Sequence, residues 1–329
     1  DADVTADQAT ALRTLDANEG VTIEGNGSYA IVDGFAGITS EQNAAAVSAA
    51  SSVTVTGDLS VAQGADVLAA KASAVFDLAD SYVNLAAGVS SGVTVPAVNI
   101  TINGAVSVVQ AQFADANFGA TELTFDLSDI PANLVGAQAL VADAQSVSVT
   151  SAATVSQAVF LRGLVNLTGG YVIEDSATSV YAALNEWNAA SGTRSTLFGA
   201  DSITLNTAAT VEQVLGVINA VSDAGEKRGL SSIDGLAYTV EDSSAAILEV
   251  ISNEAIVAAE KVALSTNEEL SVEDAIALNA LSNFTGYQDE GFQIVDTIAN
   301  IVAAQPFGIV EAAASFTVTG TYVELTNVS

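Results

Sequence analysis

The chain has 329 residues, half of them hydrophobic, which is enough for two ordinary domains or one long repeat array with a large buried core. It carries 39 acidic residues against 7 basic ones, a net charge of −32. This charge disfavours nucleic acid and anionic membrane surfaces as partners and leaves divalent cations and basic surfaces as candidates. The chain contains no Cys and no His, which excludes disulfides, thiol chemistry and the commonest general base.

Short segments of alternating apolar and polar residues recur along the chain. Alternation with a period of two predicts half-buried strands. In chain order the segments are SVTVT (52–56), NITIN (99–103), SVSVT (146–150), SITLN (202–206), a weaker VALST (262–266) and SFTVT (315–319).

A segment with helical spacing follows each of the first five strands. The helices beginning near Ala153 and Ala209 place Thr154 and Thr210 three residues before Gln157 and Gln213, the spacing of a helix N-terminal capping box. The segments beginning near Leu59 and Leu270 follow the same pattern.

A second strand and a second helix complete each repeat, and here the copies align on an aspartate. An apolar residue always follows it five positions later. The aligned pairs are Asp33 with Ile38, Asp80 with Leu85, Asp129 with Leu134, Asp175 with Val180, Asp242 with Ile247, and Asp296 with Ile301.

These repeats predict an α/β fold in which strand–helix–strand–helix units stack as a solenoid with mainly parallel strands. The first unit has a short or missing leading strand, and the last is followed by surplus strands. The expected boundaries are 1–50, 51–98, 99–145, 146–200, 201–260 and 261–314, with terminal extra strands at 315–329.

The repeated aspartates have two interpretations. An Asp between a strand and a helix is a good helix N-cap, and we expect this to be its main role. Paired carboxylates at four strand ends would alternatively suit calcium, with Asp80, Asp129, Asp175 and Asp242 as the ligands. The sequence contains neither an EF-hand loop nor a glycine- and aspartate-rich nonapeptide repeat, so diffuse cation screening is the favoured effect of calcium.

Other motifs are sparse. No P-loop, dinucleotide-binding turn or serine nucleophile elbow is present, so we expect no enzymatic activity and no cofactor other than calcium. The apolar stretch from Ile298 to Gly320 contains Pro306 and Glu311, so no membrane insertion is expected. Asn-x-Ser/Thr sequons occur at four asparagines, but in so Thr-rich a chain several arise by chance: Asn26, Asn99, Asn166 and Asn283.

The two ends of the chain suggest an assembly mode. The surplus C-terminal strand of one subunit could add to the N-terminal repeat of the next, and such a head-to-tail contact forms a filament. The interface residues would be Phe316, Val318, Tyr322, Val323 and Leu325. Alternatively, these strands fold back as a cap, or the ends are cut points in a longer array.

The segments YVIEDSATSV and YTVEDSSAAI, with the ATVxQ helices, resemble repeats of large secreted surface-layer-like and adhesin-like proteins of cyanobacteria and proteobacteria. The resemblance covers 51–319 and implies a location at the cell surface. The chain lacks Met, so we expect it to be a processed product or an internal fragment of an extracellular, secreted protein. The favoured function is a structural protein that assembles with itself into a surface layer or filament.

The alternative is an adhesive segment of a longer calcium-dependent adhesin that binds a cell-surface glycan. Its binding loops would be the insertions at 192–200 and 223–232. Both insertions are also typical of surface loops of a repeat array.

Overall fold

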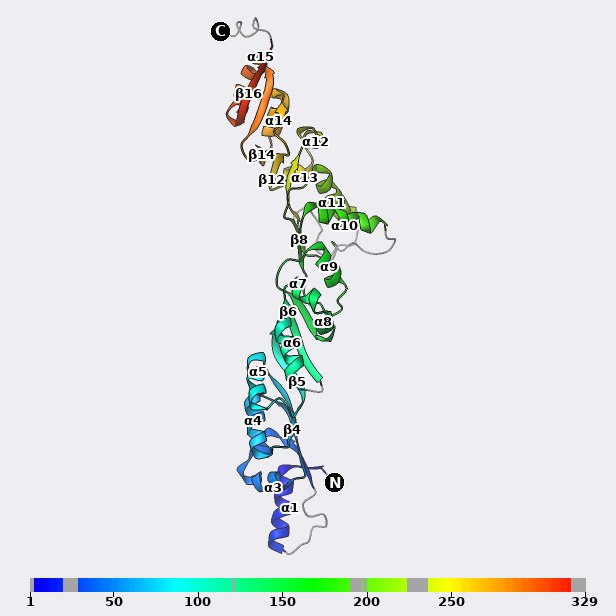
Figure 1. The fold of residues 1–329 in the computed structure, drawn as a ribbon, viewed down its shortest axis with the longest axis vertical. Coiled ribbons are helices and arrows are strands. Elements are labelled where there is room, and N and C mark those ends of the chain that lie inside the picture. Colours follow the sequence, from blue (N-terminus) through cyan, green and yellow to red (C-terminus); the bar gives the residue numbers. More distant parts are fainter. Residues whose placement is uncertain are drawn as a thin grey trace. The chain divides into compact units, whose positions relative to one another are not determined.

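The computed structural model describes residues 3–19, 29–119, 122–189, 197, 200–223 and 236–320. Strands and helices alternate along the chain (Figure 1). The chain divides into two compact units. Unit 1 comprises Asp1–Thr150 and Leu164–Thr168, and unit 2 comprises Ser151–Gly163 and Gly169–Ser329.

Unit 1 contains a seven-stranded sheet in which the strands follow their sequence order from β1 to β7, and all its strand pairs are parallel. The strands are β1 (Asp3–Val4), β2 (Ala30–Gly34), β3 (Ser52–Leu59), β4 (Val75–Ser81), β5 (Ala97–Val106), β6 (Glu122–Asp129) and β7 (Ser146–Val149). The helices are α1 (Ala6–Glu19), α2 (Phe35–Thr39), η1 (Glu41–Asn43), α3 (Ala44–Ala49), α4 (Val61–Ala70), α5 (Tyr82–Ser91), α6 (Val108–Asn117), α7 (Pro131–Gly136) and α8 (Gln138–Asp143).

One face of this sheet forms the core. Along β3, Val53 and Val55 are buried, whereas Ser52, Thr54 and Thr56 between them are exposed. Helix α4 packs against β3 and β4, and α5 packs against β4 and β5 (Figure 1). A parallel sheet in sequential order with right-handed crossovers carries its helices on one face, which explains why only every second strand residue is buried.

Unit 2 repeats the alternation but splits its strands into three parallel sheets, with the orders β10-β9-β8, β11-β12-β14 and β13-β15-β16. The strands are β8 (Val172–Asp175), β9 (Ser202–Leu205), β10 (Leu236–Ala237), β11 (Thr239–Asp242), β12 (Lys261–Leu264), β13 (Glu269–Leu270), β14 (Phe284–Tyr287), β15 (Phe292–Thr297) and β16 (Ala313–Thr319). The helices are α9 (Val155–Arg162), α10 (Ala177–Ala189), α11 (Val211–Asp223), α12 (Ser244–Glu249), α13 (Glu254–Val257), α14 (Val272–Asn279), α15 (Ile298–Ala303), η4 (Gln305–Phe307) and α16 (Ile309–Ala312).

The two units differ in whether one continuous strand pairs with both the preceding and the following strand. In β3, residues up to Thr56 pair with β2, and Thr54 also pairs with β4. Gly57 then adopts a φ of +84°, and Asp58 and Leu59 pair with β4 alone. Gly104 does the same in β5 with a φ of +88°. In unit 2, the residues 265–268 separate β12 from β13, so the strand is interrupted and the sheet divides.

The α/β class, the alternation of strands and helices and the parallel pairing are therefore confirmed. At the start of the first predicted repeat, β1 comprises two residues, Asp3 and Val4. The stacking of all repeats as one solenoid stays a prediction, as do the boundaries between the six repeats.

Within the described ranges, every helix is too short or too polar to cross a membrane.

Candidate functional site: the aspartate junctions and the groove beside Asp296

Six aspartates at strand ends make the same hydrogen bond to a helix that precedes them in the chain. In each case Oδ2 accepts from the first backbone N–H of the helix that leads into the strand. The pairs are Ala6 to Asp33 (3.0 Å), Val61 to Asp80 (3.0 Å), Val108 to Asp129 (2.9 Å), Val155 to Asp175 (2.9 Å), Val211 to Asp242 (2.9 Å) and Val272 to Asp296 (3.0 Å).

The other carboxylate oxygen faces the helix that follows. Oδ1 of each aspartate accepts from the backbone N–H of the next residue, at 2.7–2.8 Å. Each aspartate therefore joins the N-terminal ends of two consecutive helices. Unpaired amides and the helix dipole make these ends favourable positions for a carboxylate. We call this arrangement an aspartate junction.

This differs from the expected N-cap role in one respect. The N-cap of the following helix is the next residue, Ser81 after Asp80, Ile130 after Asp129 and Ser243 after Asp242. The aspartate lies one position earlier and instead satisfies the first amide of the preceding helix. The sequence could not show this contact, because it joins residues that are 19 to 31 positions apart.

The preceding helix has its own cap beside the junction. Ser60 with Gln63, Ser107 with Gln110 and Thr154 with Gln157 form reciprocal capping boxes, and Thr5 with Gln8 and Thr210 with Gln213 make the same pair of hydrogen bonds. The predicted boxes at Thr154 and Thr210 are confirmed. The aspartate thus supplies an acceptor for the amide that the capping box leaves free.

Three junctions contain a further donor that the sequence analysis missed. Asn84, Asn133 and Asn300, each four residues after the aspartate, donate to Oδ1 of Asp80, Asp129 and Asp296 at 2.7–2.8 Å. The spacing Asp-x-x-x-Asn in three of the repeats is the signal that could have revealed them.

These hydrogen bonds determine the pKa values at the same three junctions. Burial of the Asp80 and Asp129 carboxyls opposes their ionisation, but the hydrogen bonds from the asparagine and the two amides outweigh it, so each pKa lies below its ordinary value of 3.8. The amides of Val272 and Thr297, with the Asn300 side chain, lower the pKa of Asp296 in the same way.

The second carboxylate near each proposed calcium ligand does not converge with it. Glu174 and Asp175 are consecutive residues of β8, as Glu241 and Asp242 are of β11, and successive side chains of a strand point to opposite faces. Asp77 binds the backbone N–H and side chain of Asn99, and Asp126 accepts from Ser146. In the parts of the chain that the structure covers, no group of three or more acidic residues lies close enough together to hold a metal ion. Calcium at Asp80, Asp129, Asp175 and Asp242 stays a prediction.

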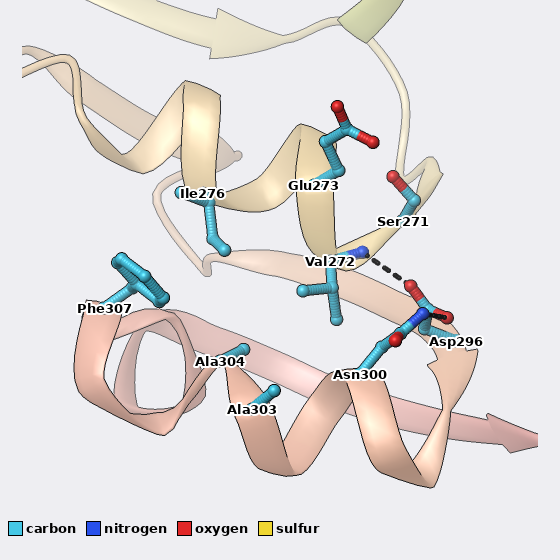
Figure 2. Close-up of a pocket in the computed structure, with 9 residues that line it drawn as sticks. All are labelled: Ser271, Val272, Glu273, Ile276, Asp296, Asn300, Ala303, Ala304 and Phe307. Carbon is cyan, nitrogen blue, oxygen red and sulfur yellow. Dashed lines mark hydrogen bonds between the residues drawn. The ribbon is translucent and has the colours of Figure 1, made fainter.

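One junction opens into a groove. A groove of about 400 Å³ lies between α14 and α15, beside Asp296. Figure 2 shows the hydrogen bonds from Val272 and Asn300 to Asp296 at one end of this groove and Phe307 at the other. Between them the lining is apolar, from Ile276, Ala303 and Ala304 (Figure 2). The carboxylates of Glu273 and Asp296 and the hydroxyl of Ser271 also line the groove, and this hydroxyl donates to Asp274.

The predicted assembly residues divide between described and undescribed parts of the chain. Phe316 and Val318 lie on β16, 38% and 44% exposed, and β16 pairs along one edge with β15 of its own chain. Tyr322, Val323 and Leu325 lie outside the described residues, as does most of each predicted insertion loop.

Besides Asn99, which donates to Asp77, two other sequon asparagines hydrogen-bond within the fold through their side chains. The side-chain amide of Asn166 donates to the carbonyls of Val141 and Ala144, and that of Asn283 donates to those of Ile256 and Ala259, at 2.7–3.0 Å. Both N–H groups of each amide are occupied, so a glycan there would remove at least one of the two bonds.

The chain is 32% identical over 98% of its length to a protein of Synechocystis sp. named S-layer protein. The chain spans only 18% of that relative, so the two share a region rather than a whole architecture. This supports an S-layer-like relationship, the coarser part of the resemblance that the repeats predict. No protein-family model matches the chain, and no solved structure matches it.

Proposed function

We propose that this chain is an extracellular structural module of a bacterial surface layer or filament, and that its copies join head to tail by strand addition at β16. The observation that supports this proposal most strongly is the similarity to the S-layer protein. It covers 98% of the chain and so extends through every repeat rather than through one site. A location at the cell surface follows from the same relative.

The exposed edge of β16 supports the assembly mode. In the sheet β13-β15-β16 it is the edge strand, so the N–H and C=O groups on its other side have no strand partner among the described residues. An edge strand of seven residues with exposed Phe316 and Val318 is a template for another strand. We also propose that the chain has no enzymatic activity, since it contains neither His nor Cys and its repeated carboxylates are engaged with helix amides.

Two nested truncations test the proposal. Removal of residues 313–329 deletes β16 and should abolish filaments or sheets in negative-stain electron microscopy. Removal of residues 321–329 leaves β16 intact and tests whether Tyr322, Val323 and Leu325 contribute. Polymers that persist without β16 would refute strand addition, and an assembly-incompetent full chain would refute self-assembly itself.

The adhesive alternative predicts a different result. Monodisperse chains that bind a cell-surface glycan array through the insertions at 192–200 or 223–232 would favour a segment of an adhesin.

A further inference from the structure

Asn103 and Gly104 lie at the point in β5 where pairing with β4 ends. Asn103, the last residue of β5 that pairs with β4, lies opposite Ser81. The pairing with β6 passes directly from Thr101 to Ala105, and Gly104 adopts a φ of +88° within this gap. The side chain of Asn103 is exposed and makes no hydrogen bond with the described residues. Its amide group is therefore not held by a neighbouring side chain.

The repeats show that this position does not need an asparagine. In β3 the equivalent pair is Thr56 and Gly57, and Gly57 has a φ of +84°. Both glycines are followed three residues later by a serine that caps the next helix, Ser60 in one case and Ser107 in the other. The glycine therefore sets the backbone conformation in both strands, and the residue before it can vary. The asparagine of β5 adds a chemical property rather than a structural one.

An asparagine that precedes a glycine can react with its own backbone. The backbone nitrogen of the glycine loses its proton and attacks the side-chain carbon Cγ, and the side-chain nitrogen leaves as ammonia. Water then opens the resulting cyclic imide on either side of its nitrogen. Cleavage of the bond to Cγ gives aspartate, and cleavage of the bond to the main-chain carbonyl carbon gives isoaspartate. Glycine favours the attack because it has no side chain to obstruct it and reaches conformations that other residues avoid.

Other candidate residues in the described chain lack one of these features. Asn99, on the same strand, precedes an isoleucine, and its side chain donates to Asp77 at 3.0 Å. Asp33 precedes a glycine, but its carboxylate accepts from two backbone amides, at 2.8 and 3.0 Å. Among the residues that the structure describes, Asn103 is the only asparagine that precedes a glycine.

We propose that Asn103 is a site of spontaneous deamidation in the folded chain, and that its isoaspartyl product loosens β5 from β6. The isoaspartyl linkage runs the main chain through Cβ and Cγ, so the backbone gains one carbon directly before the glycine. The next residues, Ala105 and Val106, then lose their register with β6. Both products also add a carboxylate to a chain whose net charge is already −32. The modification does not depend on the proposed function.

Peptide mass spectrometry of the full chain after incubation at neutral and at mildly alkaline pH tests the modification. The amide of Asn103 should be lost progressively, and faster at the higher pH, because the attacking nitrogen must lose its proton. Protein isoaspartyl methyltransferase, which methylates the new α-carboxylate, should label the product. Asn99 in the same digest should keep its amide. The variant Asn103→Thr, which introduces the pair found in β3, should give no label at this site.

Two results would refute the modification. One is that Asn103 keeps its amide as long as Asn99 does. The other is that the amide of Asn103 is lost in urea but not in buffer, because the folded backbone would then prevent the attack.

Hydrogen exchange tests the structural consequence. The amides of residues 105–106 and 126–127, which pair in the fresh chain, should exchange faster in the aged wild type, and aged Asn103→Thr should match the fresh chain. Fresh Asn103→Asp carries the added charge without the longer backbone and should exchange like the fresh wild type. Equal exchange in aged and fresh wild type would overturn the loosening of β5. Fast exchange in fresh Asn103→Asp would assign the loosening to charge and overturn the role of the isoaspartyl linkage.

Discussion

At the scale of the residue, each junction aspartate holds two helix ends against one strand. Asp129 is the most buried of them, at 9% exposed. Its carboxylate accepts hydrogen bonds from the amides of Val108 and Ile130 and from the side chain of Asn133. Three donors converge on one carboxylate, so any neutral replacement leaves some of them unpaired. The cost of an unpaired buried donor exceeds the gain from a typical hydrogen bond, which makes this residue structurally sensitive.

We expect Asp129→Ala to lower the free energy of unfolding of unit 1 by about 2–3 kcal/mol, because three donors lose their charged acceptor. Urea unfolding followed by circular dichroism measures the change. Glu122→Gln, an exposed residue of the same strand, removes the same charge and should change stability by less than about 0.5 kcal/mol. Equal effects of the two substitutions would show that net charge, not the junction, stabilises this part of the fold.

Asn133, four residues after Asp129, donates to its carboxylate and so influences how this junction responds to acid. Burial opposes ionisation of Asp129 and the hydrogen bonds overcome it, so its folded pKa is below its ordinary value. The stability that the ionised group contributes is therefore fully present above the unfolded pKa of about 3.9 and is lost as the pH falls through the lower folded pKa.

Asn133→Ala removes one of these hydrogen bonds and should raise the folded pKa of Asp129 toward its unfolded value, so that the loss of stability in acid ends at a higher pH and is smaller in total. A carboxyl carbon NMR titration reads the pKa directly. Asn117→Ala is the matched control, because Asn117 donates to a backbone carbonyl of its own helix instead. An unchanged titration of Asp129 in Asn133→Ala would mean that the two amides alone lower the pKa.

At the scale of the element, a single glycine marks the point in β3 and in β5 where pairing with the preceding strand ends. Gly57 and Gly104 have positive φ values, and a Cβ at either position would meet no atom within 4 Å, so their conformation, not space, requires glycine. The first half of β3 pairs with both β2 and β4, and that of β5 with both β4 and β6, whereas the residues after the glycine pair with the following strand alone. In unit 2, several residues separate the corresponding strand segments, such as residues 265–268 between β12 and β13, and these segments belong to different sheets.

We expect Gly104→Ala to destabilise unit 1 by about 1–2 kcal/mol, the cost of a left-handed conformation for a residue with a Cβ. Gly136→Ala, in α7 with negative φ and open space around it, should instead be neutral or stabilise by up to about 1 kcal/mol. Chemical denaturation of both variants tests the pair. A neutral Gly104→Ala would show that β5 accommodates the turn in another way.

The elements were predictable from the sequence to a large extent, and the reasons are local. Alternation located β3, β5, β7 and β9, and the capping spacing located the starts of α9 and α11, since both signals lie within a few residues. The division of unit 2 into three sheets was not predictable, because it depends on how many residues follow β9 and β12 before the next pairing. The partner of each aspartate was also missed, because that contact connects distant parts of the chain.

At the scale of the whole molecule, the charge of −32 opposes every contact between copies. Within the described part of the chain, one ion pair is present, between Lys261 and Asp289 at 2.6 Å. The remaining carboxylates that do not serve junctions are thus largely uncompensated. Assembly of such a chain requires either screening of this charge by ions in general or binding of a cation at defined places.

The two explanations make different predictions for salt. Screening depends on ionic strength, with a Debye length of about 10 Å at 0.1 M, so sodium, magnesium and calcium chlorides at equal ionic strength should promote assembly to a comparable extent. Specific calcium sites at Asp80, Asp129, Asp175 and Asp242 would make calcium effective at far lower concentration than magnesium, because calcium accepts more and less regular oxygen ligands.

We expect screening to dominate, because these aspartates already bind helix amides through both oxygens. Light scattering during titration with each salt measures assembly, and isothermal titration calorimetry measures binding. A saturable heat with calcium that magnesium does not reproduce would contradict this expectation. Its loss in Asp175→Asn, with an unchanged circular dichroism spectrum, would then place a calcium ion at that strand end, and its persistence there would direct the search to the other carboxylates.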